Sequence, residues 1–483
     1  MPDVAFLPAR TLSALVRRGR IGCLELLDHY IERVERLDPR LNAVVVRDFE
    51  RARKRARLLD RNRGRDGSSA PLYGVPMTTK ESFDVATLPT TWGHAERRDH
   101  RAAANALAVE RLEAAGALVF GKTNVPVDLA DWQSYNPLYG ATSNPWNTAH
   151  TPGGSSGGSA AALAAGLTGL EIGSDIGGSI RVPAAFCGVY GHKPTWGLLS
   201  PRGHSLAGAT AMTDISVIGP MARSADDLAL TLGLLAHPDE TETPLTMTLP
   251  APRTQSLDGL RVAVWAEQPG QATEPEVTAR IHALASFLRK QGAKVSGTAR
   301  PEFDPVEAFH VYLKLLNAAL SGRLADEVVG RQQARARSLA ADNMSADAVI
   351  MRAAGMSHRE WLGLHERRCQ IRRAWGAFFQ NWDVLLCPAF GTPALPHRQD
   401  GATWQRRITV AGQEIAYNDL LFWPGLTGGY HLPATAAPIG STKSGLPIGV
   451  QIVGPLYGDR TTIAVAKLLE TEWHGYVPPP GFD

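Results

Sequence analysis

Apolar residues near the start of the chain recur every three to four positions, which is the spacing of one face of an α-helix. The first such stripe predicts a helix that Thr11 caps and Gly19 ends. A second stripe over 24–37 predicts another helix, which ends before Pro39. A third, strongly basic helix is expected over 49–65. The chain therefore opens with helices.

Later segments change to short apolar runs, which are typical of buried strands. These runs lie at 116–123, 260–265, 384–388 and 449–454. Amphipathic spacing returns over 276–291 and over much of 306–379, where we expect helices. Proline and glycine are frequent over 426–440, which predicts a loop close to the functional site.

Composition describes a globular protein with a large core. The 483 residues are 44% hydrophobic and 20% charged, and length alone predicts about three domains. The formal net charge of +3 comes from 50 basic and 47 acidic side chains, so no strong field would attract nucleic acid or a membrane surface. No apolar run approaches the roughly 18 residues of a membrane-spanning helix, and the first residues lack a signal-peptide pattern.

Four cysteines show no paired spacing, which favours free thiols in a reducing, cytoplasmic compartment. They are Cys23, Cys187, Cys369 and Cys387.

Two loops rich in glycine and serine, 151–159 and 173–183, flank an alanine-rich run over 160–166 that predicts a short buried helix ended by a glycine. Glycines around a serine allow successive backbone N–H groups to converge on one point, which stabilises an oxyanion. Ser179 would place its hydroxyl beside such donors. An isolated run of this kind is more often a turn or linker, but two runs that bracket an apolar helix argue against a linker.

A serine hydroxyl needs a base before it becomes a good nucleophile. No GxSxG sequence with a following Asp and His is evident around Ser179. The best candidate base is Lys80, which ends a mostly uncharged run over 74–80, because burial lowers the pKa of a lysine and lets it accept a proton. The alternative is a lysine at a solvated strand end, the commoner environment for this residue type.

The two loops, over 154–158 and 175–184, resemble the signature of the amidase signature family. The similarity extends outward through 71–84, 116–124, 144–152, 185–200, 219–235 and 444–459. It does not cover the middle of the chain, roughly 241–379.

This resemblance implies a catalytic triad of Lys80, Ser155 and Ser179. Neutral Lys80 would accept a proton from Ser155, which accepts one from Ser179 as it attacks the carbonyl carbon. The resemblance also implies a cis peptide between Gly154 and Ser155, and it implies no metal or organic cofactor. The oxyanion would be held by the backbone N–H groups of Ile176, Gly177, Gly178 and Ser179.

The fold that the resemblance implies is a single large α/β domain, with a mixed, twisted central β-sheet covered by helices on both faces. N-terminal helices would occupy 8–65, the signature core 71–235, the variable substrate-pocket region about 241–379, and the C-terminal sheet and helices 380–483. Members of the family are often dimers, so a homodimer is possible.

Residues near the first loop are candidates for substrate contact. Trp132, Tyr135 and Ser156 are the expected pocket residues, although aromatic side chains in such a segment belong more often to the core. His150 is a tempting general base, but the family places a basic residue there without a catalytic role. Asp175 and Arg181 flank the oxyanion run and are expected to brace its backbone.

Two sequence features resemble a nucleotide-binding loop and a nucleic-acid surface, but each is better explained as an ordinary structural element. The run 116–123 matches the phosphate-binding pattern GxxxxGK[ST], yet its four central residues are Ala, Leu, Val and Phe, which predict a buried strand. The arginines of 49–65 could form a nucleic-acid surface, but one basic helix in a nearly neutral protein is usually a solvated face.

The sequence thus predicts an amidohydrolase that cleaves a small-molecule carboxylic amide to an acid and an amine or ammonia through a serine acyl-enzyme. An esterase or carbamate hydrolase with the same triad is an alternative. A further alternative is the A-type subunit of a tRNA-dependent amidotransferase, although that subunit's pattern has Thr where Ile176 stands. A non-catalytic binding protein would be expected to lose one triad residue.

Overall fold

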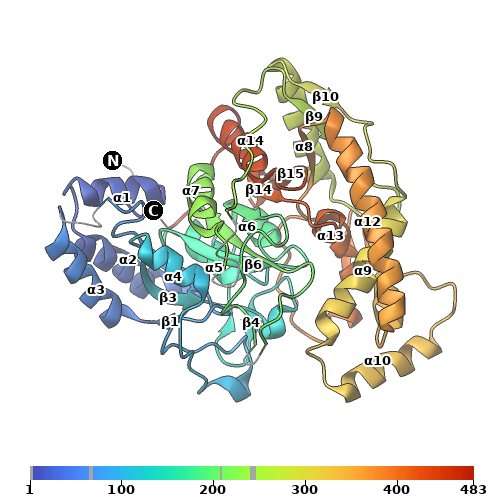
Figure 1. Ribbon diagram of the computed structural model, residues 1–483, viewed down its shortest axis with the longest axis horizontal. Helices are drawn as coiled ribbons and strands as arrows, with labels where there is room; N and C mark the ends of the chain where they lie inside the picture. Colours follow the sequence, from blue (N-terminus) through green and yellow to red (C-terminus); the bar gives the residue numbers. More distant parts are fainter. Residues whose placement is uncertain (1–3, 65–68, 207–208, 240–245, 483) are drawn as a thin grey trace.

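A mixed eight-stranded sheet runs through the middle of the molecule (Figure 1). The structure, a computed structural model, describes residues 4–64, 69–206, 209–239 and 246–482. In sheet order the strands are β10 (Lys294–Ser296), β9 (Arg261–Val264), β11 (Val384–Pro388), β15 (Pro447–Val453), β14 (Ala434–Ser441), β7 (Tyr190–Lys193), β8 (Val217–Ala222) and β6 (Glu171–Asp175). β9, β10 and β11 are parallel, and the other neighbours pair antiparallel. The predicted mixed sheet is confirmed.

Helices cover both faces of this sheet, as two consecutive residues of β7 demonstrate. A Cβ at Gly191 would lie 2.9 Å from Ala184 of α6 (Arg181–Cys187). The next side chain, His192, points the opposite way and lies 3.1 Å from Asp459 of α14 (Asp459–Glu472). The helix α5 (Gly157–Ala164) packs on α6, and α7 (Ala225–Leu235) packs on α14, while α8 (Pro275–Lys290) packs against β10 and β11.

The N-terminal part adds a three-stranded sheet in the order β1-β3-β2. Its elements are α1 (Ala9–Arg17), α2 (Cys23–Leu37), β1 (Val44–Arg47), α3 (Phe49–Asn62), β2 (Pro76–Lys80), α4 (Leu107–Ala114) and β3 (Leu118–Thr123). The strand expected over 116–123 is therefore confirmed, and the buried Lys122 donates to the Pro89 carbonyl and to Thr90 Oγ1. β2 packs against β6, which joins the two sheets.

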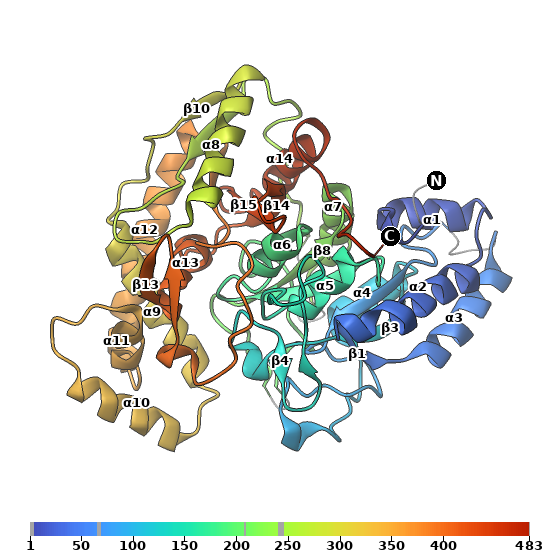
Figure 2. The ribbon, with the colours of Figure 1, turned by 180° about the vertical axis from the view of Figure 1, so that it is seen from behind.

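Five helices of the middle and C-terminal chain lie at the end of the molecule opposite α1, α2 and α3 (Figures 1 and 2). They are α9 (Pro305–Ser321), α10 (Asp326–Ser338), α11 (Ala346–Arg352), α12 (His358–Asn381) and α13 (Phe422–Gly428). A second core of mainly aromatic and leucine side chains, including Trp375 and Tyr312, holds four of them to the sheet, whereas α10 has no buried residue. Two short hairpins complete the fold, β4 (Tyr135–Asn136) with β5 (Gly140–Ala141), and β12 (Arg407–Val410) with β13 (Gln413–Ala416). Among the described residues, no helix is long and apolar enough to cross a membrane.

Two sequence expectations about element boundaries are wrong. Thr11 is not a cap, because α1 begins at Ala9, whose N–H donates to the distant Asp227 carboxylate at 2.6 Å. The segment 426–440 is not a loop, since it holds the end of α13 and most of β14. Its glycines serve close packing instead: a Cβ at Gly429 would lie 2.8 Å from the Tyr312 ring.

We expect Gly158→Ala to lower the free energy of unfolding by about 1–3 kcal/mol, the usual cost of overpacking. A Cβ at Gly158 would lie 2.4 Å from the Asn124 backbone nitrogen, so α5 would have to shift. Denaturant unfolding followed by tryptophan fluorescence measures the change. Gly233→Ala is the matched control: it is exposed within α7 with nothing near its Cβ, so it should stabilise by about 0.5–1 kcal/mol. Equal losses in both variants would refute the packing argument.

Candidate active site

Lys80 is the last residue of β2, a strand that is buried along its whole length. Its Nζ lies 2.6 Å from Ser155 Oγ and 2.9 Å from Ser174 Oγ, the second of which belongs to β6. Burial lowers the pKa of Lys80 to about 7, against the opposing pull of Asp175 and Glu171. A substantial fraction of Lys80 is therefore uncharged at neutral pH and able to accept a proton.

Ser155 follows a cis peptide bond with Gly154, as the resemblance implied. Only glycine fits at position 154, because a Cβ there would lie 2.4 Å from the Asp131 carbonyl oxygen. Ser134 holds the same loop by accepting the Gly157 N–H at 3.0 Å. The loop thus presents the Ser155 hydroxyl to Lys80 from a tightly packed backbone.

Ser179 borders the same cavity as Ser155 and Ser174. Among the described residues, no hydrogen bond joins the Ser155 and Ser179 hydroxyls, so the relay that the resemblance implies is complete only between Lys80 and Ser155. Catalytic hydrogen bonds are often long without substrate and tighten in the complex.

Three backbone N–H groups beside Ser179 are available to an oxyanion. Within the described chain, those of Ile176, Gly177 and Ser179 donate to no protein acceptor. The expectation that Gly178 would also serve is wrong, because its N–H donates to Asp175 Oδ1 at 2.8 Å. Gly178 still needs to be glycine, since its φ is +100° and a Cβ would lie 2.8 Å from Val182.

The carbonyl groups of this loop point away from the donors. Tyr312 of α9 donates its hydroxyl to the Ile176 carbonyl at 3.3 Å, and the Trp132 indole donates to the Gly177 carbonyl at 2.9 Å. In a trans peptide the C=O and the next N–H point in opposite directions. Holding the Ile176 carbonyl therefore also orients the Gly177 N–H.

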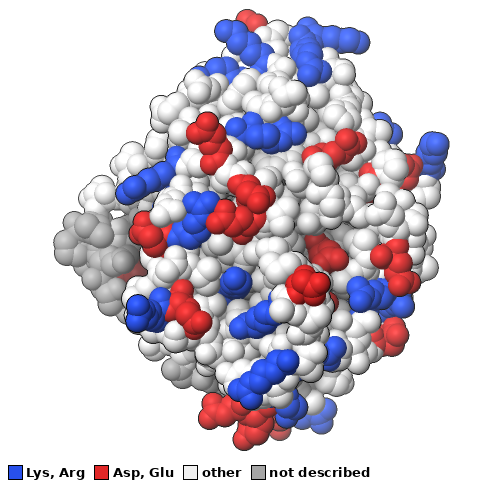
Figure 3. Space-filling model, turned by 90° about the vertical axis from the view of Figure 1, so that its right-hand side faces the viewer, with Lys and Arg blue, Asp and Glu red and all other residues white. Residues whose placement is uncertain are grey.

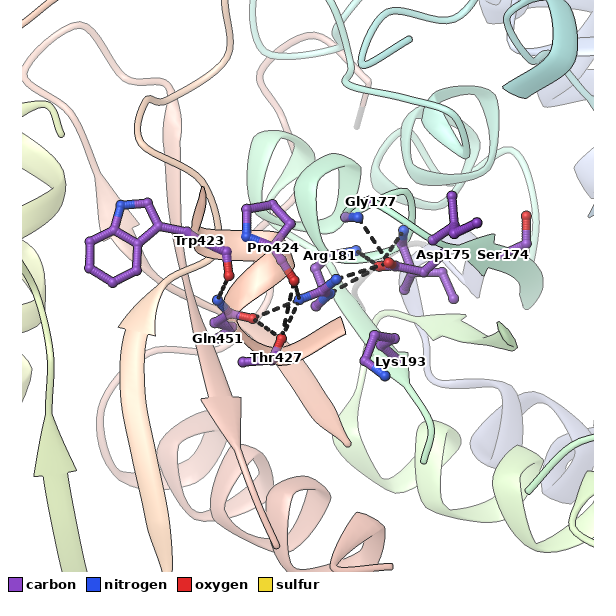
Figure 4. A network of polar contacts seen from close by, with 12 residues as sticks. Ser174, Asp175, Gly177, Arg181, Lys193, Trp423, Pro424, Thr427 and Gln451 are labelled. Atoms are coloured by element: carbon purple, nitrogen blue, oxygen red, sulfur yellow. Dashed lines mark hydrogen bonds and ion pairs between the residues drawn. The ribbon is translucent and has the colours of Figure 1, made fainter. Parts of the chain in front are cut away.

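A buried ion pair supports the loop from below (Figure 4). Asp175 accepts two hydrogen bonds from the Arg181 guanidinium, at 2.9 and 3.0 Å, and both side chains are fully buried. The remaining guanidinium nitrogen donates to Pro424, Thr427 and Gln451. Burial alone would raise the pKa of Asp175, but Arg181 overcomes this and the pKa falls to about 2. The expectation that Asp175 and Arg181 brace the loop is confirmed.

The cavity in front of these groups has a volume of about 650 Å³. Trp132 lines it, whereas Tyr135 and Ser156 are not among the lining residues. The Tyr135 hydroxyl accepts a hydrogen bond from Arg406, and the Ser156 hydroxyl bonds to the backbone of Ser174. Both side chains therefore support the walls from behind.

Sequence reasoning missed several lining residues. Ser174 lies beside Asp175 in the second loop, 173–183, and was given no role; alternation along a strand could have placed it toward Lys80. No local sequence pattern marked His204, Arg323 or the lining residues of α9, α10 and α11 as part of the cavity. His150 is absent from the lining, in keeping with its exclusion from the triad. In the described part of the chain, no cluster of three His, Cys, Asp or Glu side chains could hold a metal ion.

Comparison with known proteins agrees with this geometry. The Amidase family matches residues 25–463. The chain is 34% identical over 478 residues to the A-type subunit of the glutamyl-tRNA(Gln) amidotransferase of Synechococcus sp. (strain CC9902), with 94% of each chain covered. It is 32% identical over 488 residues to an acylamidase of Rhodococcus erythropolis, with 97% of this chain and 96% of the relative covered. A solved bacterial aryl acylamidase superposes with a TM-score of 0.80, at 25% identity and 96% coverage of each chain.

The class of protein follows from these relatives together with the fold: this is an amide-hydrolysing enzyme. More specifically, the chain belongs to the amidase signature family.

We expect Arg181→Met to lower the free energy of unfolding by about 3–5 kcal/mol near neutral pH, because it leaves a buried carboxylate without its partner. The folded-state pKa of Asp175 lies below its unfolded value near 4, so the contribution of the pair is present above that pH and is lost as the pH falls toward 2. The difference between wild type and variant should therefore shrink in acid, as denaturant titrations at several pH values would show.

Arg10→Met provides the control for this measurement. Arg10 also pairs with an aspartate, Asp226, at 2.8 Å, but the two side chains are 57% and 31% exposed, so its removal should cost about 1 kcal/mol or less. A loss at Arg181 as small as that at Arg10 would show that burial does not strengthen the first pair.

Proposed function

We propose that the chain cleaves a carboxylic amide to an acid and an amine through an acyl-enzyme on Ser179. The observation that carries this proposal is the buried Lys80 Nζ, which has a lowered pKa and lies 2.6 Å from Ser155 Oγ. Ser155 and Ser179 both line the cavity. No metal or organic cofactor takes part in the proposed steps. The cytosol is the proposed compartment, because the four cysteines are free.

The first half of the reaction forms the acyl-enzyme. Lys80 accepts the Ser155 proton while Ser155 accepts the Ser179 proton, and Ser179 Oγ bonds to the carbonyl carbon. The N–H groups left free on the loop stabilise the oxyanion, each good donor contributing about 3 kcal/mol. Ser155 then donates its proton to the amine nitrogen, Lys80 returns a proton to Ser155, and the C–N bond breaks.

Water completes the cycle by the reverse relay. It attacks the acyl carbon, loses a proton through Ser155 to Lys80, and releases the acid as Ser179 regains its proton. The same steps hydrolyse an ester or a carbamate, so these substrates are also within reach of the proposed chemistry.

A second candidate is the glutaminase-like subunit of a tRNA-dependent amidotransferase, which the 34% identity to such a subunit favours. The cavity supports a larger and more apolar acyl group than the short side chain of glutamine. Its volume is about 650 Å³, and Trp132, Ile176 and Leu421 stand among its apolar lining residues. We therefore favour a free-standing amidase.

Fluorophosphonate labelling tests the nucleophile. We expect intact mass to show one adduct on the wild type and none on Ser179→Ala, since the probe reacts with an activated serine. Ser216→Ala, which changes another serine of the cavity lining, should retain the adduct. Lys80→Met should keep the fold and lose at least about 100-fold in amide turnover. An adduct on Ser179→Ala would refute the assignment.

The same purified chain separates the two candidate functions. Turnover of aryl and alkyl amides without any partner protein is the result expected of a free-standing amidase. Glutamine hydrolysis that appears only when partner subunits and tRNA are added, with no turnover of the simple amides, would favour the amidotransferase component instead.

The pH dependence tests the base. Because neutral Lys80 is the active form, kcat/KM should rise with pH through an apparent pKa of about 7 and then level off. A second lysine could give the same profile, because burial also lowers the pKa of Lys193 to about 7. Among the described residues, however, its Nζ donates only to the Pro194 carbonyl and contacts no residue of the proposed triad. Lys193→Met should therefore show the same rise of kcat/KM with pH as the wild type. If kcat/KM of that variant does not change with pH, the titrating group is Lys193 and not Lys80.

A further inference from the structure

One wall of the cavity leads away from the oxyanion loop along α9. Tyr312 contacts the loop through the Ile176 carbonyl, and Leu316 and Leu320 line the cavity one and two turns further along the helix. A helix rises about 1.5 Å per residue, so Leu320 lies roughly 12 Å beyond Tyr312. This wall suits an extended apolar chain attached to the reacting carbonyl.

The wall ends at arginines on α10. Arg331 and Arg335 both line the cavity, and their spacing of four residues places them on one face of the helix. The Arg335 guanidinium lies 3.5 Å from the centre of the Trp404 ring, which also lines the cavity. Helix α10 has no buried residue, so it contributes little to the core and covers the cavity instead.

The two arginines at this end of the lining, Arg331 and Arg335, form no direct ion pair with any described residue. Each aspartate of the lining has a partner of its own: Asp128 bonds to His94 at 2.6 Å, Asp131 to Arg406 at 2.5 Å, and Asp347 to Asn418 at 2.7 Å. Asp347 is within electrostatic reach of Arg335 but forms no ion pair with it. Basic and acidic side chains are interspersed over the outer face of this end (Figure 3).

Two side-chain amides in the same lining lack protein partners. Asn317, on α9 between Leu316 and Leu320, is buried and its Nδ2 has no hydrogen-bond partner in the described structure. Gln332, between the two arginines, has a buried Oε1 without a partner, and rotation of its amide would present the NH₂ group instead. A buried unpaired donor is costly unless a ligand supplies an acceptor.

We propose that the acyl portion of the substrate is an apolar chain that ends in a carboxylate, which Arg331 and Arg335 bind. This inference rests on the proposed acyl-enzyme at Ser179. The apolar wall buries the methylene groups, and the two guanidinium groups supply charge-assisted, fork-like hydrogen bonds for the carboxylate. Asn317 provides a further donor along the path.

The test measures binding to Ser179→Ala, so that it does not depend on turnover. Isothermal titration compares octananilide with suberic acid monoanilide, which has the same chain length and a terminal carboxylate. We expect the acid to bind at least tenfold more tightly and to weaken as salt is raised, while the neutral anilide is insensitive to salt. Adding Arg331→Gln and Arg335→Gln should abolish the preference.

Arg337→Gln is the matched control, since Arg337 lies on the same helix and is exposed like Arg331 and Arg335, but is absent from the lining; the preference should survive there. Equal binding of the two anilides, or a preference that survives the double substitution, would overturn the proposal. If Ser179→Ala prefers the acid but the wild-type chain hydrolyses neither anilide, the carboxylate site stands and only the acyl-enzyme function is overturned.

Discussion

The buried pair of Asp175 and Arg181 is the interaction on which the geometry of the site depends. Two charges removed from water are costly unless every polar group finds a partner. Here Asp175 also accepts the N–H groups of Gly178 and Ile180, and Arg181 also donates to groups of α13 and β15. The pair therefore ties the loop over 175–181 to two elements that are distant in the sequence, α13 and β15. Asp175 accepts the N–H groups of Gly178 and Ile180, and in the described chain those of Ile176, Gly177 and Ser179 have no protein acceptor.

Lys80 lies on the other side of β6, and there burial lowers the pKa and favours the uncharged form, whereas Arg181 keeps Asp175 charged. Ser174 and Asp175 are consecutive in this strand, so their side chains point to opposite sides of it. Ser174 faces Lys80, whereas Asp175 faces Arg181. Lys80 consequently receives hydroxyl groups rather than a carboxylate as its neighbours, and burial lowers its pKa. One strand thus keeps a fully charged pair and a nearly neutral base apart.

Local sequence signals were sufficient for the buried strands, and the resemblance carried by local motifs named Lys80, Ser155 and Ser179 as the proposed triad. The loops that carry Ser155 and Ser179 are contiguous, and β3 was evident from its apolar run. The sequence was not sufficient where a role depends on a distant partner. Nothing local indicates that Tyr312 reaches a carbonyl 136 positions away, or that Asp175 takes the Gly178 N–H. For the same reason the walls of the cavity, which come from α9, α10 and α11, could not be predicted.

Helix α9 contacts both the loop that carries the proposed oxyanion donors and the cavity. Its Tyr312 fixes the peptide between Ile176 and Gly177, and the ring also fills the space that Gly425 and Gly429 of the α13 region leave open. Later residues of the same rigid helix form the cavity wall. Substitutions on the α9 wall reach the proposed oxyanion donors through Tyr312, whose packing against two glycines resists a shift. The middle of the chain can vary its substrate contacts while the loop keeps its geometry.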